Sequence, residues 1–140
     1  MARSRYVRQR LLTLAEQSYL LKTAFPNFRV KVGRRELRCL GELRPTWLSD
    51  NYLFELLYQI PDRPRVHVIS PPLRLPPGHF RLKHVFKDDR LCLYTEGDWR
   101  PDLPISSHVV PWISEWLSFY EDWLVTREWL GGGHEPSGAE

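Results

Sequence analysis

Apolar residues near the start of the chain recur at helical spacing. Between residues 5 and 24 they fall at steps of three and four positions and form one stripe of an amphipathic helix. The stripe ends at Phe25-Pro26-Asn27, where proline removes a backbone donor and stops the helical pattern. The spacing therefore predicts an N-terminal helix over residues 5–24.

A period of two follows, which is typical of β-strands. Residues 28–43 alternate around a break at Gly33 and predict two strands, with Cys39 inside the alternation as a core residue. Residues 51–60 and 65–69 predict a third and a fourth strand. Because parallel strands need crossovers of about a dozen residues or more, connections this short predict an antiparallel four-stranded meander.

Residues 70–78 are rich in proline and follow the predicted sheet. Proline has no backbone N–H, so this stretch cannot form a regular ladder of hydrogen bonds. We expect a stiff connector that carries the chain from the sheet to a loop around Cys92. A polyproline ligand for an SH3-type domain is the alternative interpretation.

The second helix gives the clearest periodic signal. Ser106 or Ser107 can cap it, and Pro111 then falls in the first turn, where its missing N–H does little harm. The helix is expected to run to about Glu128 and to stop at the glycines that begin with Gly131. Aromatic stripes at this spacing usually belong to a core, so we expect the tryptophans to pack against the sheet. The apolar positions that recur at three- and four-residue intervals are Ile105, Val109, Trp112, Ile113, Trp116, Tyr120, Trp123 and Leu124.

The composition is that of one folded domain of ordinary size. The chain has 140 residues, 42% of them hydrophobic, and its aromatic fraction of 13% includes six tryptophans. We expect a single domain over residues 1–130 and a flexible, glycine-rich tail over residues 131–140. With 20 basic and 17 acidic residues, the net charge of +3 does not by itself indicate a nucleic-acid partner.

The two cysteines are far apart in the sequence, which predicts neither a disulfide framework nor a zinc site. A reducing cytoplasm is the natural setting for such a chain. The basic N-terminus has an apolar run too short for a signal sequence, and no stretch approaches the roughly 18 apolar residues of a membrane span. We therefore expect a soluble, cytoplasmic protein.

Cys92 lies between two leucines, just after a charged turn at Asp88-Asp89. A hydrophilic break followed by Leu-Cys-Leu-Tyr predicts a turn that leads into a short, half-buried extended segment. A thiol in that position would lie at the edge of the core, within reach of a partner. The other interpretation is an inert core cysteine, because cysteine is among the most frequently buried residue types.

This region resembles the active-site segment of ubiquitin-conjugating enzymes. In that family a His-Pro-Asn motif precedes an Ile-Cys-Leu nucleophile, and a Trp-x-Pro-x-Leu-x-Ile segment leads into a helix. The matching positions here are His84, Leu91-Cys92-Leu93 and residues 99–105, and residues 58–68 resemble the family's strand entry. No asparagine follows His84, so the group that replaces it stays open. Together with the Trp-Leu-rich helix, the pattern is similar to the bacterial branch found in type II CBASS antiphage operons beside a cyclic-nucleotide synthase.

The resemblance implies a fold and a function. The fold would be α+β and ubiquitin-conjugating-like, with an N-terminal helix, a four-stranded antiparallel meander, an active-site loop and a long C-terminal helix. Cys92 would carry the C-terminus of a protein as a thioester and pass it to an amine, in bacterial antiviral defence. The donor would be the cyclic-nucleotide synthase, a nucleotidyltransferase. A separate activating enzyme would be needed, because the chain has no phosphate-binding glycine loop.

Several neighbours of Cys92 are candidates to support this chemistry. Only a deprotonated thiol attacks, and His84 is the histidine that the resemblance selects to assist it. Asp88, Asp89 and Tyr94 flank the thiol and could orient or deprotonate an incoming amine, although turn formation and strand pairing would also explain them. We expect no cofactor and no metal.

Arg5, Arg8 and Arg10 precede the first acidic residue, at a helix end whose dipole favours anions. A solvated, frayed helix end explains them, whereas the family suggests docking on the activating enzyme. Two other functions stay open. An inactive relative could serve as a binding module, which the missing asparagine favours and the retained Cys92 opposes. A nucleic-acid binder would use these arginines, and the modest net charge argues against it.

Overall fold

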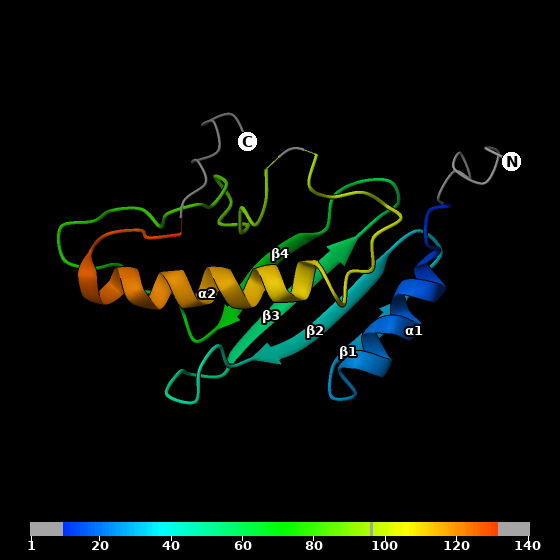
Figure 1. Ribbon diagram of the computed structural model, residues 1–140, viewed down its shortest axis with the longest axis horizontal. Helices are drawn as coiled ribbons and strands as arrows, with labels where there is room; N and C mark the ends of the chain where they lie inside the picture. Colours follow the sequence, from blue (N-terminus) through cyan, green and yellow to red (C-terminus); the bar gives the residue numbers. More distant parts are fainter. Residues whose placement is uncertain (1–9, 96, 132–140) are drawn as a thin grey trace, which may run out of the picture.

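The structure, a computed structural model, describes residues 10–95 and 97–131. Two helices and four strands lie in these ranges, in the order that the sequence predicts (Figure 1). The protein is therefore α+β, with one helix before the sheet and a longer helix after it. The elements are α1 (Leu14–Ala24), β1 (Arg29–Val32), β2 (Leu37–Leu43), β3 (Tyr52–Tyr58), β4 (Arg65–Ser70) and α2 (Val109–Thr126).

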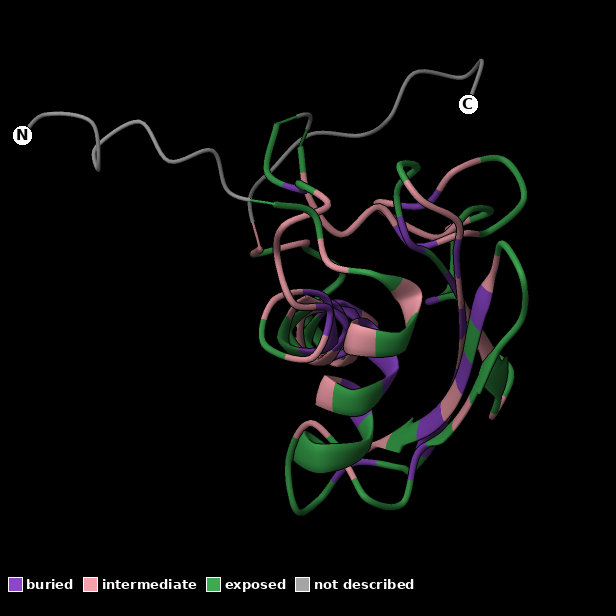
Figure 2. Ribbon diagram, turned by 90° about the vertical axis from the view of Figure 1, so that its right-hand side faces the viewer, coloured by how far each residue is buried: buried purple, intermediate pink, exposed green. Residues whose placement is uncertain are grey.

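The four strands form one sheet in the order β1-β2-β3-β4, and every neighbouring pair is antiparallel, so the predicted meander is confirmed. Along β3, buried positions alternate with half-buried ones from Tyr52 to Tyr58, because successive side chains point to opposite faces. Cys39 pairs with Leu56 and is fully buried, as expected for a core residue. α2 crosses the sheet (Figure 1), and positions coloured as buried occur on both the helix and the sheet in Figure 2.

Aromatic side chains of α2 fill the space against the sheet. Trp116 is 4% exposed and Trp123 is fully buried, which confirms for both the prediction that tryptophans of this helix belong to the core.

One carboxylate of α2 also links the helix to residues at the start of β3 and in the loop before it. Glu121 accepts hydrogen bonds from the Ser49 hydroxyl and from the Tyr52 hydroxyl, each at 2.7 Å.

The N-terminal helix is shorter than predicted. It begins at Leu14, and residues 10–13 are not helical, so a continuous helix from residue 5 is wrong. The cause is a capping box. The Thr13 hydroxyl accepts the Glu16 N–H at 3.1 Å, and the Glu16 carboxylate accepts the Thr13 N–H at 2.9 Å. These reciprocal bonds fix the start of the helix at Leu14, although apolar residues at helical spacing also occur before this position.

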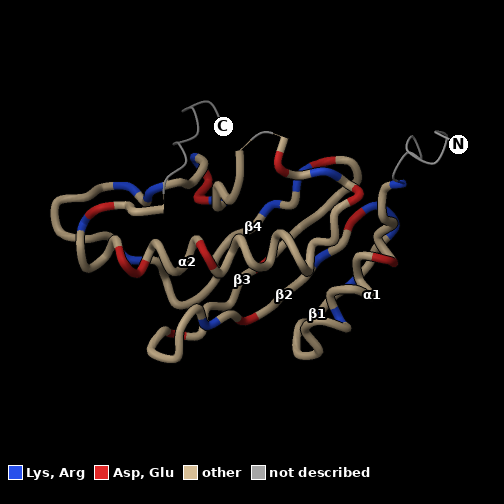
Figure 3. The backbone as a smooth tube through the Cα atoms, viewed as in Figure 1, with Lys and Arg blue, Asp and Glu red and all other residues tan. Residues whose placement is uncertain are grey.

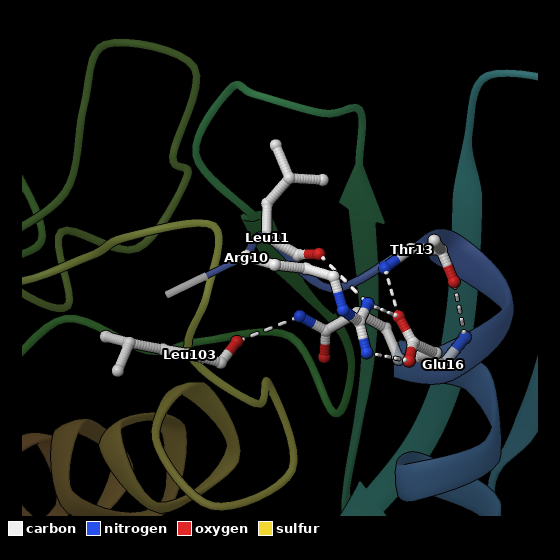
Figure 4. Close-up of polar contacts among 6 residues, drawn as sticks. Arg10, Leu11, Thr13, Glu16 and Leu103 are labelled. Carbon is white, nitrogen blue, oxygen red and sulfur yellow. Dashed lines mark hydrogen bonds and ion pairs between the residues drawn. The ribbon is translucent and has the colours of Figure 1, made fainter. Parts of the chain in front are cut away.

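Arg10 braces this cap instead of lying inside the helix. Its guanidinium donates two hydrogen bonds to the Glu16 carboxylate, at 2.6 and 2.8 Å (Figure 4). Together with the backbone bond from Thr13, these bonds lower the pKa of Glu16 to about 2. Arg5 and Arg8 lie outside the described residues, so a role for them in partner binding stays a prediction.

Gln17 fastens α1 to the segment that precedes α2. Its side chain is fully buried, and its amide nitrogen donates to the Leu103 carbonyl at 2.8 Å (Figure 4). Its amide oxygen accepts the Ile105 N–H at 2.9 Å. One side chain therefore satisfies two backbone groups that are 86 and 88 residues away in the sequence. The first helix and the approach to the second are held together by this contact.

The first turn of α2 has no side-chain cap. The N-cap residue is His108, whose side chain makes no capping hydrogen bond, so the predicted caps Ser106 and Ser107 are wrong. The Ile105 carbonyl accepts the first two helical N–H groups, at 2.9 and 3.1 Å, and this backbone turn replaces a capping hydroxyl. Pro111 lies in the first turn, as predicted.

The end of α2 reverses the chain. The helix ends at Thr126, earlier than predicted, because Arg127 adopts a left-handed conformation with φ of 67° and donates its N–H to the Trp123 carbonyl at 2.7 Å. The chain then runs back along the helix (Figure 1). A Cβ at Gly131 would lie 2.5 Å from the Phe119 ring, so glycine permits this close packing. The rest of the predicted tail lies outside the described residues.

Candidate active site

Residues 84–92 form a narrow hairpin between the proline-rich connector and α2. Val85 pairs with Leu91 across the hairpin. The turn predicted at Asp88-Asp89 is confirmed, with Asp89 in a left-handed conformation at φ of 65°. The Leu91 N–H donates to the Val66 carbonyl at 2.9 Å, which fastens the hairpin to the edge of the sheet at β4.

Cys92 and His84 face each other at the open end of the hairpin. The Cys92 N–H donates to the His84 carbonyl at 2.8 Å. Val85 and Leu91, the next pair along, are buried in the core. His84 and Cys92 are instead half-buried, and His84 has a left-handed backbone with φ of 52°. Both residues line one pocket, so the fold brings together the thiol and the histidine that the sequence singled out.

This thiol pocket has a volume of about 210 Å³. Its walls come from the hairpin, the loop that follows Cys92, α2 and the segment after α2. Cys92 is half-buried, as predicted, and its Sγ lies 3.9 Å from the Tyr94 carbonyl oxygen. The thiol is therefore held at the edge of the core, next to a hollow that a small group can enter.

Two tryptophans position His84. Trp116 of α2 donates its indole N–H to the His84 carbonyl at 3.1 Å. Trp129 packs on the imidazole with ring centres 4.8 Å apart. Trp129 follows α2 and reaches the pocket only because the chain reverses at Arg127, so the periodicity of the sequence did not identify it. A tryptophan beyond the end of a helix is not part of a periodic pattern, so the sequence does not indicate which residues it contacts.

The predicted acidic residues lie at the tip of the hairpin, away from the pocket lining. Asp88 accepts a hydrogen bond from Arg90 Nε at 3.0 Å and lies 3.9 Å from His67 Nε2. Partial burial raises the pKa of Asp88, but the bonds from Arg90 outweigh it and the net pKa is lowered. Asp89 is exposed. Asp88 and Asp89 therefore form the turn, and a role for either of them in orienting or deprotonating an amine stays a prediction.

Other carboxylates line the thiol pocket. Asp98 comes from the loop after Cys92 and Glu115 from the exposed side of α2. Asp98 also closes its own loop, since one carboxylate oxygen accepts the Thr95 N–H at 3.0 Å and the Thr95 hydroxyl at 2.9 Å. Sequence reasoning missed both acids, because neither is adjacent to the thiol along the chain.

Tyr94, two residues after the thiol, contacts both Trp112 and Pro64. Its ring packs on Trp112 with ring centres 5.0 Å apart, and its hydroxyl donates to the Pro64 carbonyl at 3.4 Å. Burial raises the pKa of the phenol, and the charges of Arg63 and Arg90 oppose that rise. Packing and a hydrogen bond therefore hold Tyr94 in place, and a role for it in orienting or deprotonating an amine stays a prediction.

In residues 10–95 and 97–131, no three side chains of His, Cys, Asp or Glu lie close enough together to hold a metal ion. Neither α1 nor α2 combines the length and the apolar content that a helix needs to cross a bilayer.

The fold and the site define the class: an α+β protein that presents a half-buried thiol between a hairpin and its last helix. A family model described as Type II CBASS E2 protein matches residues 17–136. The chain belongs to this family, and it is an E2-like protein of CBASS defence. No curated protein matches the chain. The family match confirms the resemblance drawn from the region around Cys92.

Proposed function

We propose that this protein is a ubiquitin-conjugating-like transferase whose Cys92 carries a protein C-terminus as a thioester. The observation that carries the proposal is the half-buried thiol on the pocket side of the hairpin, in a member of an E2-like family. Cys39 is no rival, because it is fully buried and burial raises its pKa to about 12. The order of α1, meander, hairpin and α2 supports a ubiquitin-conjugating-like fold.

The proposed chemistry has two steps. First, the Cys92 thiolate attacks the carbonyl carbon of an activated acyl group, so that a C–S bond forms and the bond to the activating group breaks. Second, the lone pair of an amine attacks the thioester carbonyl, a C–N bond forms, the C–S bond breaks and the thiolate leaves. The amine loses a proton in this step, so a base beside the thiol assists it.

Asp98 and Glu115 are the carboxylates best placed to receive the amine. Both line the thiol pocket, whereas Asp88 and Asp89 do not. A carboxylate attracts the protonated form of an amine and can accept the proton that it releases. His84, which faces Cys92 across the hairpin and lines the same pocket, is the second candidate base.

The proposed acyl donor is the C-terminus of the cyclic-nucleotide synthase of the same operon, and membership of the CBASS family supports it. Activation is assigned to a partner, because the sequence lacks a phosphate-binding glycine loop. Arg5, Arg8 and Arg10 are the proposed contacts to that partner. Arg10 also braces the cap of α1, so reversal of Arg5 and Arg8 alone tests docking without disturbing that cap.

The test is the intact mass of the protein under non-reducing conditions, after expression with its native neighbouring genes. Wild type should carry an adduct that thiols remove, and its mass identifies the donor. Cys92→Ser should carry a thiol-resistant ester, and Cys92→Ala should carry nothing. Cys39→Ala is the matched control and should keep the adduct. Absence of an adduct from both wild type and Cys92→Ser would overturn the proposal in favour of a catalytically inactive binding module.

A further inference from the structure

A second hollow adjoins the thiol pocket. Its volume is about 370 Å³, and Leu93 and Tyr94 line both hollows, so the two adjoin at these residues. Charged positions of both signs are spread along the trace of the chain (Figure 3). This hollow, which we call the arginine groove, departs from that mixture, because three arginines line it against the single carboxylate of Asp62. The arginines are Arg63, Arg65 and Arg90.

Two of the arginines project from fixed backbone. Arg65 is the first residue of β4 and is paired with β3. Arg63 follows a turn in which the Asp62 N–H donates to the Gln59 carbonyl at 2.7 Å. The Trp99 indole donates to the Asp62 carbonyl at 3.3 Å and holds this turn in place. Because the backbone is already ordered, a ligand would have to immobilise only the side chains.

Arg90 is oriented by its neighbours. Its guanidinium lies 4.6 Å from the centre of the Phe86 ring, and its Nε donates to Asp88 at 3.0 Å. The side chain of Arg90 is 24% exposed, whereas that of Asp88 is 58% exposed and also faces His67. Among the described residues, only Asp88 accepts a hydrogen bond from the Arg90 side chain. The guanidinium therefore has donors left for a second carboxylate.

The positive charge reaches the junction of the two hollows. Tyr94 lies at this junction, with its ring on Trp112 of the thiol pocket and its hydroxyl on the carbonyl of Pro64, which lines the arginine groove. Arg63 and Arg90 both act on the Tyr94 phenol, where they oppose the rise in its pKa that burial causes. Two guanidinium groups therefore lie close to Tyr94, which lines both the arginine groove and the thiol pocket.

We propose that the arginine groove binds an acidic segment of the acyl donor, just ahead of the C-terminal residue that reaches Cys92. The identity of the ligand as the donor rests on the proposed function. The thiol pocket holds Asp98 and Glu115 and suits a cationic amine, whereas the groove suits carboxylates. Opposite charges in adjoining hollows thus separate the two substrates, an acidic donor tail and a cationic acceptor.

The first experiment measures non-covalent binding, so it does not depend on thioester chemistry. The full chain with Cys92→Ala is titrated into a fluorescein-labelled peptide that has a run of glutamates ahead of a C-terminal glycine, and anisotropy is recorded. A second peptide has glutamine in place of every glutamate. We expect the glutamate peptide to bind at least about tenfold more tightly, with an affinity that falls as salt is added.

The variants locate the binding. Arg63→Glu combined with Arg65→Glu should abolish binding of the glutamate peptide. The matched control is Lys22→Glu combined with Arg29→Glu, which reverses the same number of exposed charges on α1 and β1 and should leave binding unchanged. Equal affinity for the two peptides, or an equal loss of binding in both double variants, would overturn the arginine groove as an acidic-peptide site.

The second experiment separates this proposal from the proposed function. The Cys92 adduct is measured by intact mass in the Arg63→Glu, Arg65→Glu variant expressed with the native neighbours, and its yield should fall at least about tenfold. An undiminished adduct refutes the groove but leaves acyl transfer standing. Peptide binding without any adduct on the wild type refutes the assignment of the ligand as an acyl donor.

Discussion

Gln17→Ala should destabilise the protein strongly, although Gln17 lies far from Cys92 in the sequence. The amide of Gln17 satisfies the Leu103 carbonyl and the Ile105 N–H, and the side chain is fully buried. Each buried backbone group left without a partner costs about 1–3 kcal/mol. Loss of both contacts should therefore reduce the free energy of unfolding by about 2–6 kcal/mol.

The assay is urea unfolding followed by tryptophan fluorescence and by circular dichroism. With a slope of about 2 kcal/mol per molar urea, the midpoint of Gln17→Ala should fall by about 1–3 M. Tyr19→Ala is the matched control, because Tyr19 lies on the same helix and is 69% exposed. That variant should stay within about 0.5 kcal/mol of wild type.

A Gln17→Ala variant as stable as Tyr19→Ala would refute the reasoning, since it would mean that the two backbone groups find other partners or water at no cost. Gln17→Glu sharpens the test. The carboxylate can still accept the Ile105 N–H but cannot donate to the Leu103 carbonyl in its ionised form. It should therefore also be destabilised at neutral pH, and by less at a pH that protonates the new carboxyl group.

Two further predictions concern reactivity and pH. At pH 8, iodoacetamide should label Cys92 in the native protein and spare Cys39, whose raised pKa leaves a thiolate fraction of only about 10⁻⁴; equal labelling of both in a peptide map would contradict this. The pKa of Glu16 is lowered to about 2, so its stabilising contribution is complete above the unfolded value of about 4.3 and is lost as the pH falls toward 2. The difference in urea midpoint between wild type and Glu16→Gln should accordingly shrink over that window, and a constant difference would speak against the Arg10 brace.

Local patterns determined the elements of this protein. The period of two identified all four strands, and the helical period identified α2, because each pattern reflects which face of an element is buried. The element ends were less predictable. The start of α1 depends on reciprocal bonds between Thr13 and Glu16, and the end of α2 depends on a left-handed residue at Arg127. Local interactions and backbone conformation set both helix ends, although the apolar pattern in the sequence continues beyond each of them.

The candidate site also has one part that the sequence predicts and another part that only the tertiary structure assembles. The local pattern predicted the turn before the thiol and a half-buried Cys92, whereas the resemblance to ubiquitin-conjugating enzymes selected Cys92 as the nucleophile and His84 as its neighbour. Asp98, Glu115 and Trp129 join them only in the tertiary structure, when α2 packs across the sheet and the chain reverses after it. Sequence patterns predict contacts between residues that are close along the chain. The lining of a pocket comes from distant segments, and the packing of the whole core determines which of these segments lie together.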